Sequence, residues 1–259
     1  MTPPSVTTNT SPKPRRLWRW LLSAVLVAIV LAAGAFLAWA MTPLGPTASA
    51  LAALESDAAV TVEAGEWLVF RPANAEPTTG FIFYPGGRVD YRSYAPQMRA
   101  LAEQGYLAVI APMPLSLAVL SPDKAASIMA DFPQIERWAL GGHSLGGAMA
   151  AAFVSSHPDA ADGLVLWAAY PAGNTDLSGL DLTVASVYGT NDQVATPAEI
   201  LDSQSRLPAA TRWAAIEGGN HAQFGSYGPQ PGDGQPDISA QEQTEQTAAA
   251  TVEILSGLQ

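Results

Sequence analysis

Apolar positions along the chain follow two different periods. Continuous apolar runs alternate with segments whose apolar residues are spaced as on one face of a helix. The runs that predict buried strands are, in chain order, GFIFYPGG, YLAVIAP, RWALGG, DGLVLWAAYP, LTVASVYGTND and TRWAAIEGG. Apolar runs separated by helices are typical of a mostly parallel sheet that helices cover on both faces. The sequence therefore predicts an α/β fold.

Helical segments lie between these runs. They are YAPQMRALAEQG, SPDKAASIMADF, LGGAMAAAFVSSH, TPAEILDSQSRLP and ISAQEQTEQTAAATVEILSG, and a hairpin, VTVEAGEWLVFRP, precedes the first run. In the second of these helices we expect Ser121 as the N-cap and Pro122 at the first helical position. Ligands of parallel sheets bind at the carboxyl ends of the strands, so residues that directly follow a strand are the first candidates for a site.

The longest apolar block stands near the beginning of the chain. Residues 21–40 carry no charge, and twenty helical residues extend about 30 Å, the thickness of the hydrocarbon core of a bilayer. Four basic residues precede the block and the next is Arg71, a distribution that keeps the N-terminus in the cytoplasm. We expect a membrane anchor over residues 17–40. The alternative is a cleaved signal peptide, because Ala38-Trp39-Ala40 has the small-x-small pattern of a cleavage site.

These patterns divide the chain into four parts. They are a disordered cytoplasmic N-terminus (1–16), the anchor (17–40), a linker with one helical turn (41–57) and the α/β domain (58–259). The domain is then extracytoplasmic, either held at the cell membrane or secreted if the leader is cleaved.

Charge and cysteine content exclude several functions of that domain. All 23 acidic residues but only eight of the 12 basic residues follow the anchor, which argues against nucleic acid or an anionic membrane surface as its partner. The absence of cysteine excludes disulfides, thiolate catalysis and cysteine-based metal sites.

One strand-to-helix turn carries a candidate nucleophile. Ser144 is the centre of Gly142-His143-Ser144-Leu145-Gly146, which matches the G-x-S-x-G pattern between an apolar strand and a helix. The glycines leave room for the backbones that pass each other at a sharp turn. The alternative is a Gly-rich connection with an incidental serine. A phosphate-binding loop does not fit, because neither G-x-G-x-x-G nor G-x-x-x-x-G-K-[ST] occurs here.

A serine hydroxyl needs a base, and the chain offers only His143, His157 and His221. His143 is adjacent to the serine on a sharp turn and should point elsewhere, while His157 ends the following helix, away from the strand carboxyl ends. His221 directly follows the last strand and is the expected base. Asp192 follows the preceding strand and is the expected orienting acid, in the order Ser…Asp…His.

Alternatives to Asp192 and the remaining parts of the site can also be named. Asp176 and Asp181 precede the strand and are poorer candidates, and Asp192 could instead form an Asx-turn. An oxyanion hole needs two backbone N–H groups, one from Leu145 and one from the turn after FIFY, where Gly87 or Arg88 is the expected donor.

At this point the chain resembles the α/β-hydrolase superfamily, over roughly residues 58–257. The motifs that carry the resemblance are YPGG, GGHSLGG, GTND and GGNHAQFG. It looks most like the compact, dienelactone-hydrolase-like bacterial branch, although dienelactone hydrolases proper use cysteine. The resemblance implies an α/β-hydrolase fold with Ser144, Asp192 and His221 as its triad and without a cofactor. About eleven residues between the strands that end at Tyr170 and begin near Leu182 leave no room for a large cap.

The site is therefore expected to be open, or to be covered by two loops. They are Pro112–Leu120 and Phe224–Asp237. Asp233 and Asp237 in the second loop offer a weak hint of calcium, but a full ligand loop is missing, so no metal site is expected.

The sequence thus predicts a membrane-anchored, outward-facing serine hydrolase that acts on an ester or similar acyl bond of a small molecule. Two alternatives stay open: an extracytoplasmic acyltransferase with the same triad, and a non-catalytic binding domain on a hydrolase scaffold.

Overall fold

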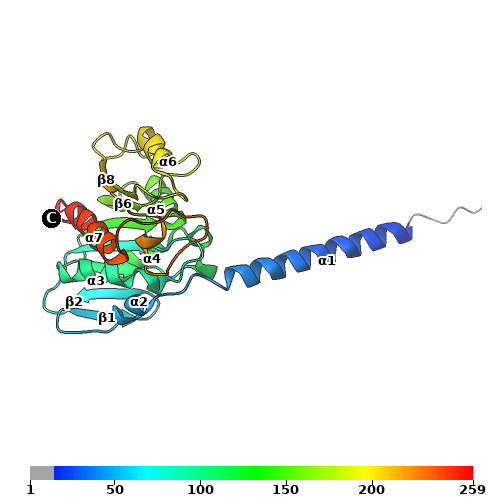
Figure 1. Ribbon diagram of the computed structural model, residues 1–259, viewed down its shortest axis with the longest axis horizontal. Helices are drawn as coiled ribbons and strands as arrows, with labels where there is room; N and C mark the ends of the chain where they lie inside the picture. Colours follow the sequence, from blue (N-terminus) through cyan, green and yellow to red (C-terminus); the bar gives the residue numbers. More distant parts are fainter. Residues whose placement is uncertain (1–14, 259) are drawn as a thin grey trace, which may run out of the picture. The chain divides into compact units, whose positions relative to one another are not determined.

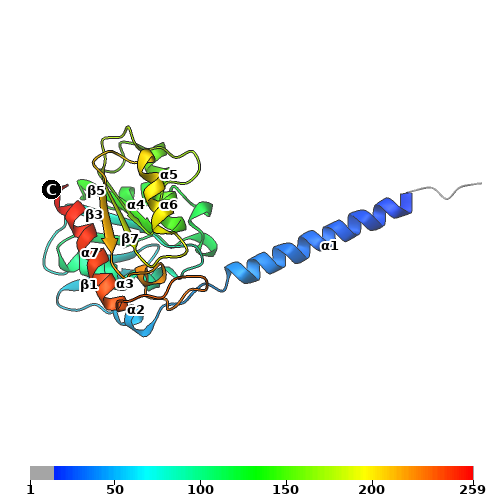
Figure 2. The same ribbon diagram turned by 45° about the horizontal axis from the view of Figure 1, so that its top comes forward.

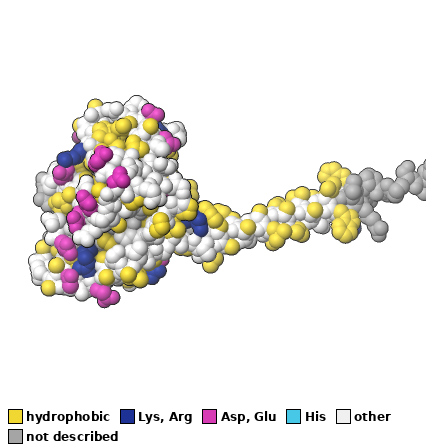
Figure 3. Space-filling view, viewed as in Figure 1, with side chains coloured by type: hydrophobic (Ala, Val, Ile, Leu, Met, Phe, Trp, Pro, Cys, Tyr) yellow, Lys and Arg dark blue, Asp and Glu magenta, His cyan; other side chains and the backbone are white. Residues whose placement is uncertain are grey.

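The computed structural model describes residues 15–258, and the chain divides into two compact units, Met1–Met41 and Thr42–Gln259. The first unit contains helix α1 (Arg15–Ala40), and most of the predicted disordered segment 1–16 lies outside the described residues (Figure 1). The stretch Trp18–Ala40 has 23 residues, a mean hydropathy of 2.7 and exposed apolar side chains, which Figure 3 shows in yellow. This helix is long and apolar enough to cross a membrane, as the sequence predicted.

The second unit is built on one sheet of eight strands. In chain order they are β1 (Val60–Ala64), β2 (Leu68–Pro72), β3 (Thr79–Tyr84), β4 (Leu107–Ile110), β5 (Arg137–His143), β6 (Gly163–Trp167), β7 (Thr183–Gly189) and β8 (Arg212–Ile216). Their order across the sheet is β1-β2-β4-β3-β5-β6-β7-β8. The predicted hairpin, β1 and β2, is antiparallel and joins β4 antiparallel, whereas all other neighbours are parallel. The α/β-hydrolase fold is confirmed.

Helices cover both faces of this sheet (Figures 1 and 2). The α-helices of the unit are α2 (Ala48–Ala52), α3 (Ala95–Glu103), α4 (Lys124–Asp131), α5 (Leu145–Ser156), α6 (Pro197–Asp202) and α7 (Ala240–Ser256). Short 3-10 turns are η1 (Tyr91–Tyr94), η2 (Pro114–Ser116), η3 (Ala118–Leu120), η4 (Ser203–Arg206) and η5 (Ala222–Phe224). The described residues between β6 and β7 contain no helix, in agreement with the predicted absence of a cap domain.

Alternate side chains of the central strands explain why the apolar runs are continuous. Phe81 and Phe83 of β3 belong to a core that also includes α3 and α7, whereas Ile82 and Tyr84 belong to a second core with α4 and α5. Both faces of the strand are buried, so the positions from Phe81 to Tyr84 are all apolar. The carboxyl ends of the parallel strands lie at one edge of the sheet. The sequence predicted the candidate site residues at this edge.

Helix α4 begins later than the sequence predicted. Its first residue is Lys124, and neither Ser121 as the N-cap nor Pro122 at the first helical position is observed. The hydroxyl of the buried Tyr84 takes the place of a capping side chain: it accepts a hydrogen bond from Ala125 N–H at 2.8 Å and donates one to Pro122 O at 2.6 Å. A tertiary contact thus satisfies a first-turn N–H group that local capping would otherwise satisfy.

The segment predicted as a linker, 41–57, packs against the sheet unit from Thr42 onward. Leu44 pairs with Val89 in a short bridge, and Thr47 N–H donates to Ser226 O at 2.8 Å. The expected helical turn is α2. These contacts join the segment to the turn after β3 and to the loop after His221.

Candidate active site

Ser144 lies in a strained turn between β5 and α5. Its φ of 52° and ψ of −122° place it in a left-handed region that non-glycine residues rarely adopt. A Cβ atom at Gly146 would collide with the carbonyl oxygen of Tyr84, and one at Gly142 would collide with the backbone of Gly146. The two glycines are therefore required by close backbone approach, as the pattern predicted, and they hold the serine at the carboxyl end of β5.

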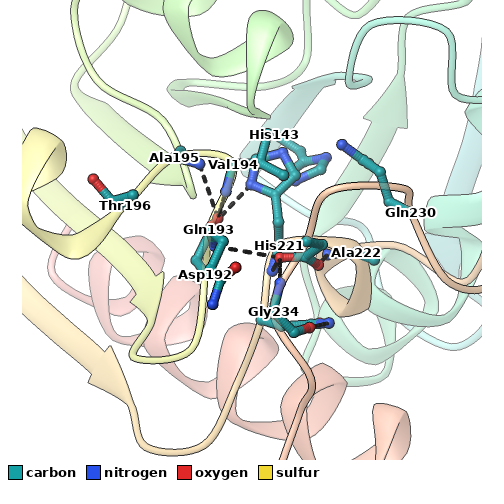
Figure 4. Close-up of polar contacts among 12 residues, drawn as sticks. His143, Asp192, Gln193, Val194, Ala195, Thr196, His221, Ala222, Gln230 and Gly234 are labelled. Atoms are coloured by element: carbon teal, nitrogen blue, oxygen red, sulfur yellow. Dashed lines mark hydrogen bonds and ion pairs between the residues drawn. The ribbon is translucent and has the colours of Figure 1, made fainter.

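The base and acid candidates meet directly. His221 Nδ1 lies 2.8 Å from Asp192 Oδ2, and neither side chain is exposed by more than 1% (Figure 4). Because an ionised carboxylate only accepts hydrogen bonds, this contact fixes the proton of the neutral imidazole on Nδ1 and leaves Nε2 as the acceptor. The pair comes from the loops after β7 and β8, as the sequence predicted.

The second oxygen of Asp192 is held by the backbone. Its Oδ1 accepts N–H bonds from Val194 and Ala195, both at 2.8 Å (Figure 4). The Asx-turn that the sequence offered as an alternative role is therefore present together with the histidine contact. Asp176, by contrast, is exposed and its pKa is lowered by the backbone N–H of Ser178, with no contact to a histidine.

Ser144 is joined to this pair through its neighbour. The ring of His143 lies 4.5 Å from the ring of His221 between centroids, so the turn that carries the serine packs beside the base. Among the described residues, the hydroxyl of Ser144 makes no hydrogen bond. Catalytic hydrogen bonds are often long in ligand-free enzymes and tighten only when substrate binds.

Some backbone N–H groups near Ser144 already donate hydrogen bonds within the protein, and others do not. Gly86 N–H donates to the hydroxyl of Tyr94 at 3.0 Å, and Arg88 N–H donates to Ser116 O at 2.8 Å. Within the described residues, Gly87 N–H and Leu145 N–H have no acceptor. Gly87 also lies close to the side chain of Leu145. Of the two donors that the sequence left open, Gly87 is the one whose N–H group is unused.

A buried Tyr94–His143 pair supports the turn from behind, and sequence reasoning missed it. Burial raises the pKa of Tyr94, so its hydroxyl is protonated; it accepts from Gly86 and donates to His143 Nδ1 at 2.9 Å. His143 is 1% exposed, and burial, followed by the nearby His221, holds its pKa well below the ordinary value of 6.5. His143 is therefore a neutral structural residue, since its Nδ1 is an acceptor.

Because His143 is buried in its neutral form, we expect the protein to lose stability in acid. Because its pKa is lower in the folded than in the unfolded state, its stabilising contribution is complete above 6.5 and is lost as the pH falls below that value. We expect the free energy of unfolding to fall by up to about 1.4 kcal/mol per pH unit from this group. Urea unfolding over this range should give a shallower dependence for His143→Gln than for the wild type, and equal slopes would contradict the assignment.

A small apolar cavity of about 190 Å³ adjoins the serine. Its lining consists mostly of small or aliphatic side chains: Ser144, Leu145, Ala148, Ala168, Ala169, Tyr170, Ala172, Val194 and Ala195. The cavity lies between the first turn of α5 and the loops after β6 and β7. It therefore places apolar surface directly beside the candidate nucleophile.

The described residues contain no group of three His, Asp or Glu side chains that could hold a metal ion. Asp233 and Asp237, which gave the hint of calcium, both accept hydrogen bonds from protein groups. The oxygens of both carboxylates bind N–H groups of the protein, and these groups take the place that a cation would need.

Known proteins share both the sequence pattern and the fold. The model of the alpha/beta hydrolase family matches residues 80–245. A predicted CIB-like hydrolase from Thermoplasma acidophilum is 18% identical with a TM-score of 0.55, over 77% of this chain and 99% of that chain. TT1662 from Thermus thermophilus is 13% identical with a TM-score of 0.54, over 76% and 98%. Comparison with curated proteins gave no match. At these identities the structural similarity concerns the fold alone.

Proposed function

Because the chain belongs to the alpha/beta hydrolase family, we propose that it is a serine hydrolase that cleaves an ester or related acyl bond through an acyl-enzyme. Ser144 is the nucleophile, His221 is the general base and acid, and Asp192 orients the imidazole. The observation that carries this proposal is the buried contact of His221 Nδ1 with Asp192 Oδ2 at 2.8 Å, beside the strained turn of Ser144.

The proposed reaction has two halves. Ser144 Oγ attacks the acyl carbonyl carbon while His221 Nε2 takes the hydroxyl proton, and the imidazolium is steadied by Asp192. The proton then passes to the leaving oxygen, and the bond between that oxygen and the acyl carbon breaks. In the second half, water attacks the acyl-enzyme, His221 accepts its proton and returns it to Ser144 as the acid product leaves.

Charge on the carbonyl oxygen needs preorganised donors during both halves. We assign this role to Leu145 N–H and Gly87 N–H, because both groups lack an acceptor among the described residues whereas Arg88 N–H is already bonded. Leu145 is also the first residue of α5, where the partial positive charge of the helix N-terminus adds to the stabilisation.

The cavity beside Ser144 favours a short acyl group. Its volume of about 190 Å³ is smaller than the roughly 300 Å³ at which pockets for larger ligands begin. With the full-length chain in detergent, we expect kcat/KM for p-nitrophenyl esters to be highest for acyl groups of about two to four carbons and to fall with length. An optimum at long chains would contradict this assignment of the cavity, and no turnover of any ester would contradict the proposed function.

We also propose that α1 anchors the protein and that the catalytic unit is extracytoplasmic. The apolar stretch Trp18–Ala40 supports an anchor, and the basic residues before it support a cytoplasmic N-terminus. Because the chain lacks cysteine, a cysteine introduced at the exposed Glu103 is a unique reporter. An impermeant maleimide should label it in intact cells, and protection until lysis would contradict this topology.

A further inference from the structure

Asp233 lies in the loop that follows His221, and its carboxylate binds backbone groups of two other segments. Oδ2 accepts Ala222 N–H at 2.8 Å, while Oδ1 accepts His221 N–H at 3.3 Å and Gln193 N–H at 3.4 Å. Oδ1 also accepts the N–H of Gly234 at 2.7 Å. One carboxylate thus joins the residue after Asp192 to the base residue itself and its neighbour.

The rest of the segment 233–237, which we call the strap, reinforces the same connection. Asn191 Nδ2 donates to Gln235 O at 3.0 Å and to Asp237 Oδ2 at 2.9 Å. Asn220 Nδ2 donates to Gly234 O at 2.8 Å. Each residue that directly precedes a member of the acid–base pair is therefore bonded to the strap.

The backbone of the strap packs closely against the loop after β7. A Cβ atom at Gly234 would collide with the carbonyl oxygen of Asn191, so this position admits only glycine at the observed distance. The loops after β7 and β8 also meet through Asn191 N–H and Gly219 O at 2.8 Å. That bond joins them one residue before Asp192 and two before His221, whereas Asp233 joins them at the pair and beyond it.

On the basis of the proposed function, we propose that Asp233 is a positioning residue that sets the distance between Asp192 and His221. Its negative charge makes the bonds to backbone N–H groups charge-assisted, which strengthens them relative to neutral ones. Displacement of a catalytic group by about 1 Å can lower the rate about 100-fold. The strap acts on catalysis through the two loops that carry Asp192 and His221.

The test compares Asp233→Ala with Gln230→Ala as a matched control. Gln230 lies in the same loop, and its side chain accepts a hydrogen bond from the hydroxyl of Tyr227 at 3.1 Å. With the most active ester in the full-length protein, we expect Asp233→Ala to lower kcat by about 10- to 100-fold and to change KM by less than about threefold. Gln230→Ala should retain kcat within about twofold. Wild-type kcat in Asp233→Ala would overturn the proposal.

A conservative variant keeps the test decisive if Asp233→Ala does not fold. Asp233→Asn preserves size and one carbonyl acceptor but loses the charge and the bond to Ala222. We expect an intermediate loss of kcat, about three- to tenfold, at unchanged KM. Wild-type kcat in this variant would then overturn the proposal.

A readout independent of turnover separates this inference from the proposed function. In ¹⁵N-histidine NMR spectra the wild-type His221 ring should be protonated on Nδ1 alone. In Asp233→Ala we expect a mixture of both tautomers, because the carboxylate of Asp192 no longer meets the ring at a fixed position. If the wild type cleaves no ester, the proposed function fails, yet a change of tautomer still supports the positioning role. An unchanged tautomer in Asp233→Ala would overturn it.

Discussion

Substitution of Ser144 by alanine is expected to lower kcat by about 10⁶-fold, the loss seen when the nucleophile of a serine triad is removed. The variant keeps the backbone, since alanine meets the left-handed φ of 52° with the same Cβ atom as serine. We therefore expect little change in thermal stability. Residual activity would come from the oxyanion donors and from substrate binding alone.

The matched control for this variant is Ser156→Ala. Ser156 is exposed at the end of the same helix, where its hydroxyl donates to Ala152 O at 3.0 Å. Its substitution should leave kcat within about twofold of the wild type. Wild-type activity in Ser144→Ala would show that another residue attacks the substrate.

The second large effect is expected from Asp192→Asn, with a fall in kcat of about 10⁴-fold. The structure gives the reason. Oδ1 is held by the N–H groups of Val194 and Ala195, so the amide nitrogen of asparagine must occupy the position of Oδ2. It then donates to His221 Nδ1 and forces the ring proton onto Nε2, which can no longer accept the proton of Ser144.

Asp176→Asn is the control for this substitution. Asp176 is one of the two poorer candidates that the sequence offered, and its carboxylate accepts the backbone N–H of Ser178 at 2.9 Å. Its kcat should remain within about twofold of the wild type. A similar loss in both variants would argue against Asp192 as the orienting acid.

Much of the fold follows from apolar runs that are visible in the sequence. The central strands carry nearly continuous apolar runs because helices cover both faces, and the neighbours Phe81 and Ile82 belong to different cores. The predicted start of α4 was wrong because the hydroxyl of Tyr84 accepts the N–H group of Ala125 in the first turn of the helix. The two residues are forty-one positions apart in the chain. No local pattern encodes such a contact.

In the candidate site, too, some features could be predicted from the sequence and others depend on tertiary contacts. Ser144 directly follows β5, and Asp192 and His221 lie in the loops after β7 and β8, so their common edge could be predicted from the order of elements. The choice of Gly87 over Arg88 depends on which backbone N–H group is already bonded, and the role of Asp233 depends on a loop without regular structure. Both are tertiary hydrogen bonds that leave no periodic signal in the chain.

Labelling with a fluorophosphonate probe, followed by peptide mapping of the full-length protein, tests the central claim most directly. Such probes react covalently with a serine that a neighbouring base activates. We expect one adduct, on Ser144, and a greatly reduced labelling rate in His221→Ala. An adduct on a different residue, or undiminished labelling of Ser144→Ala, would contradict the proposed mechanism.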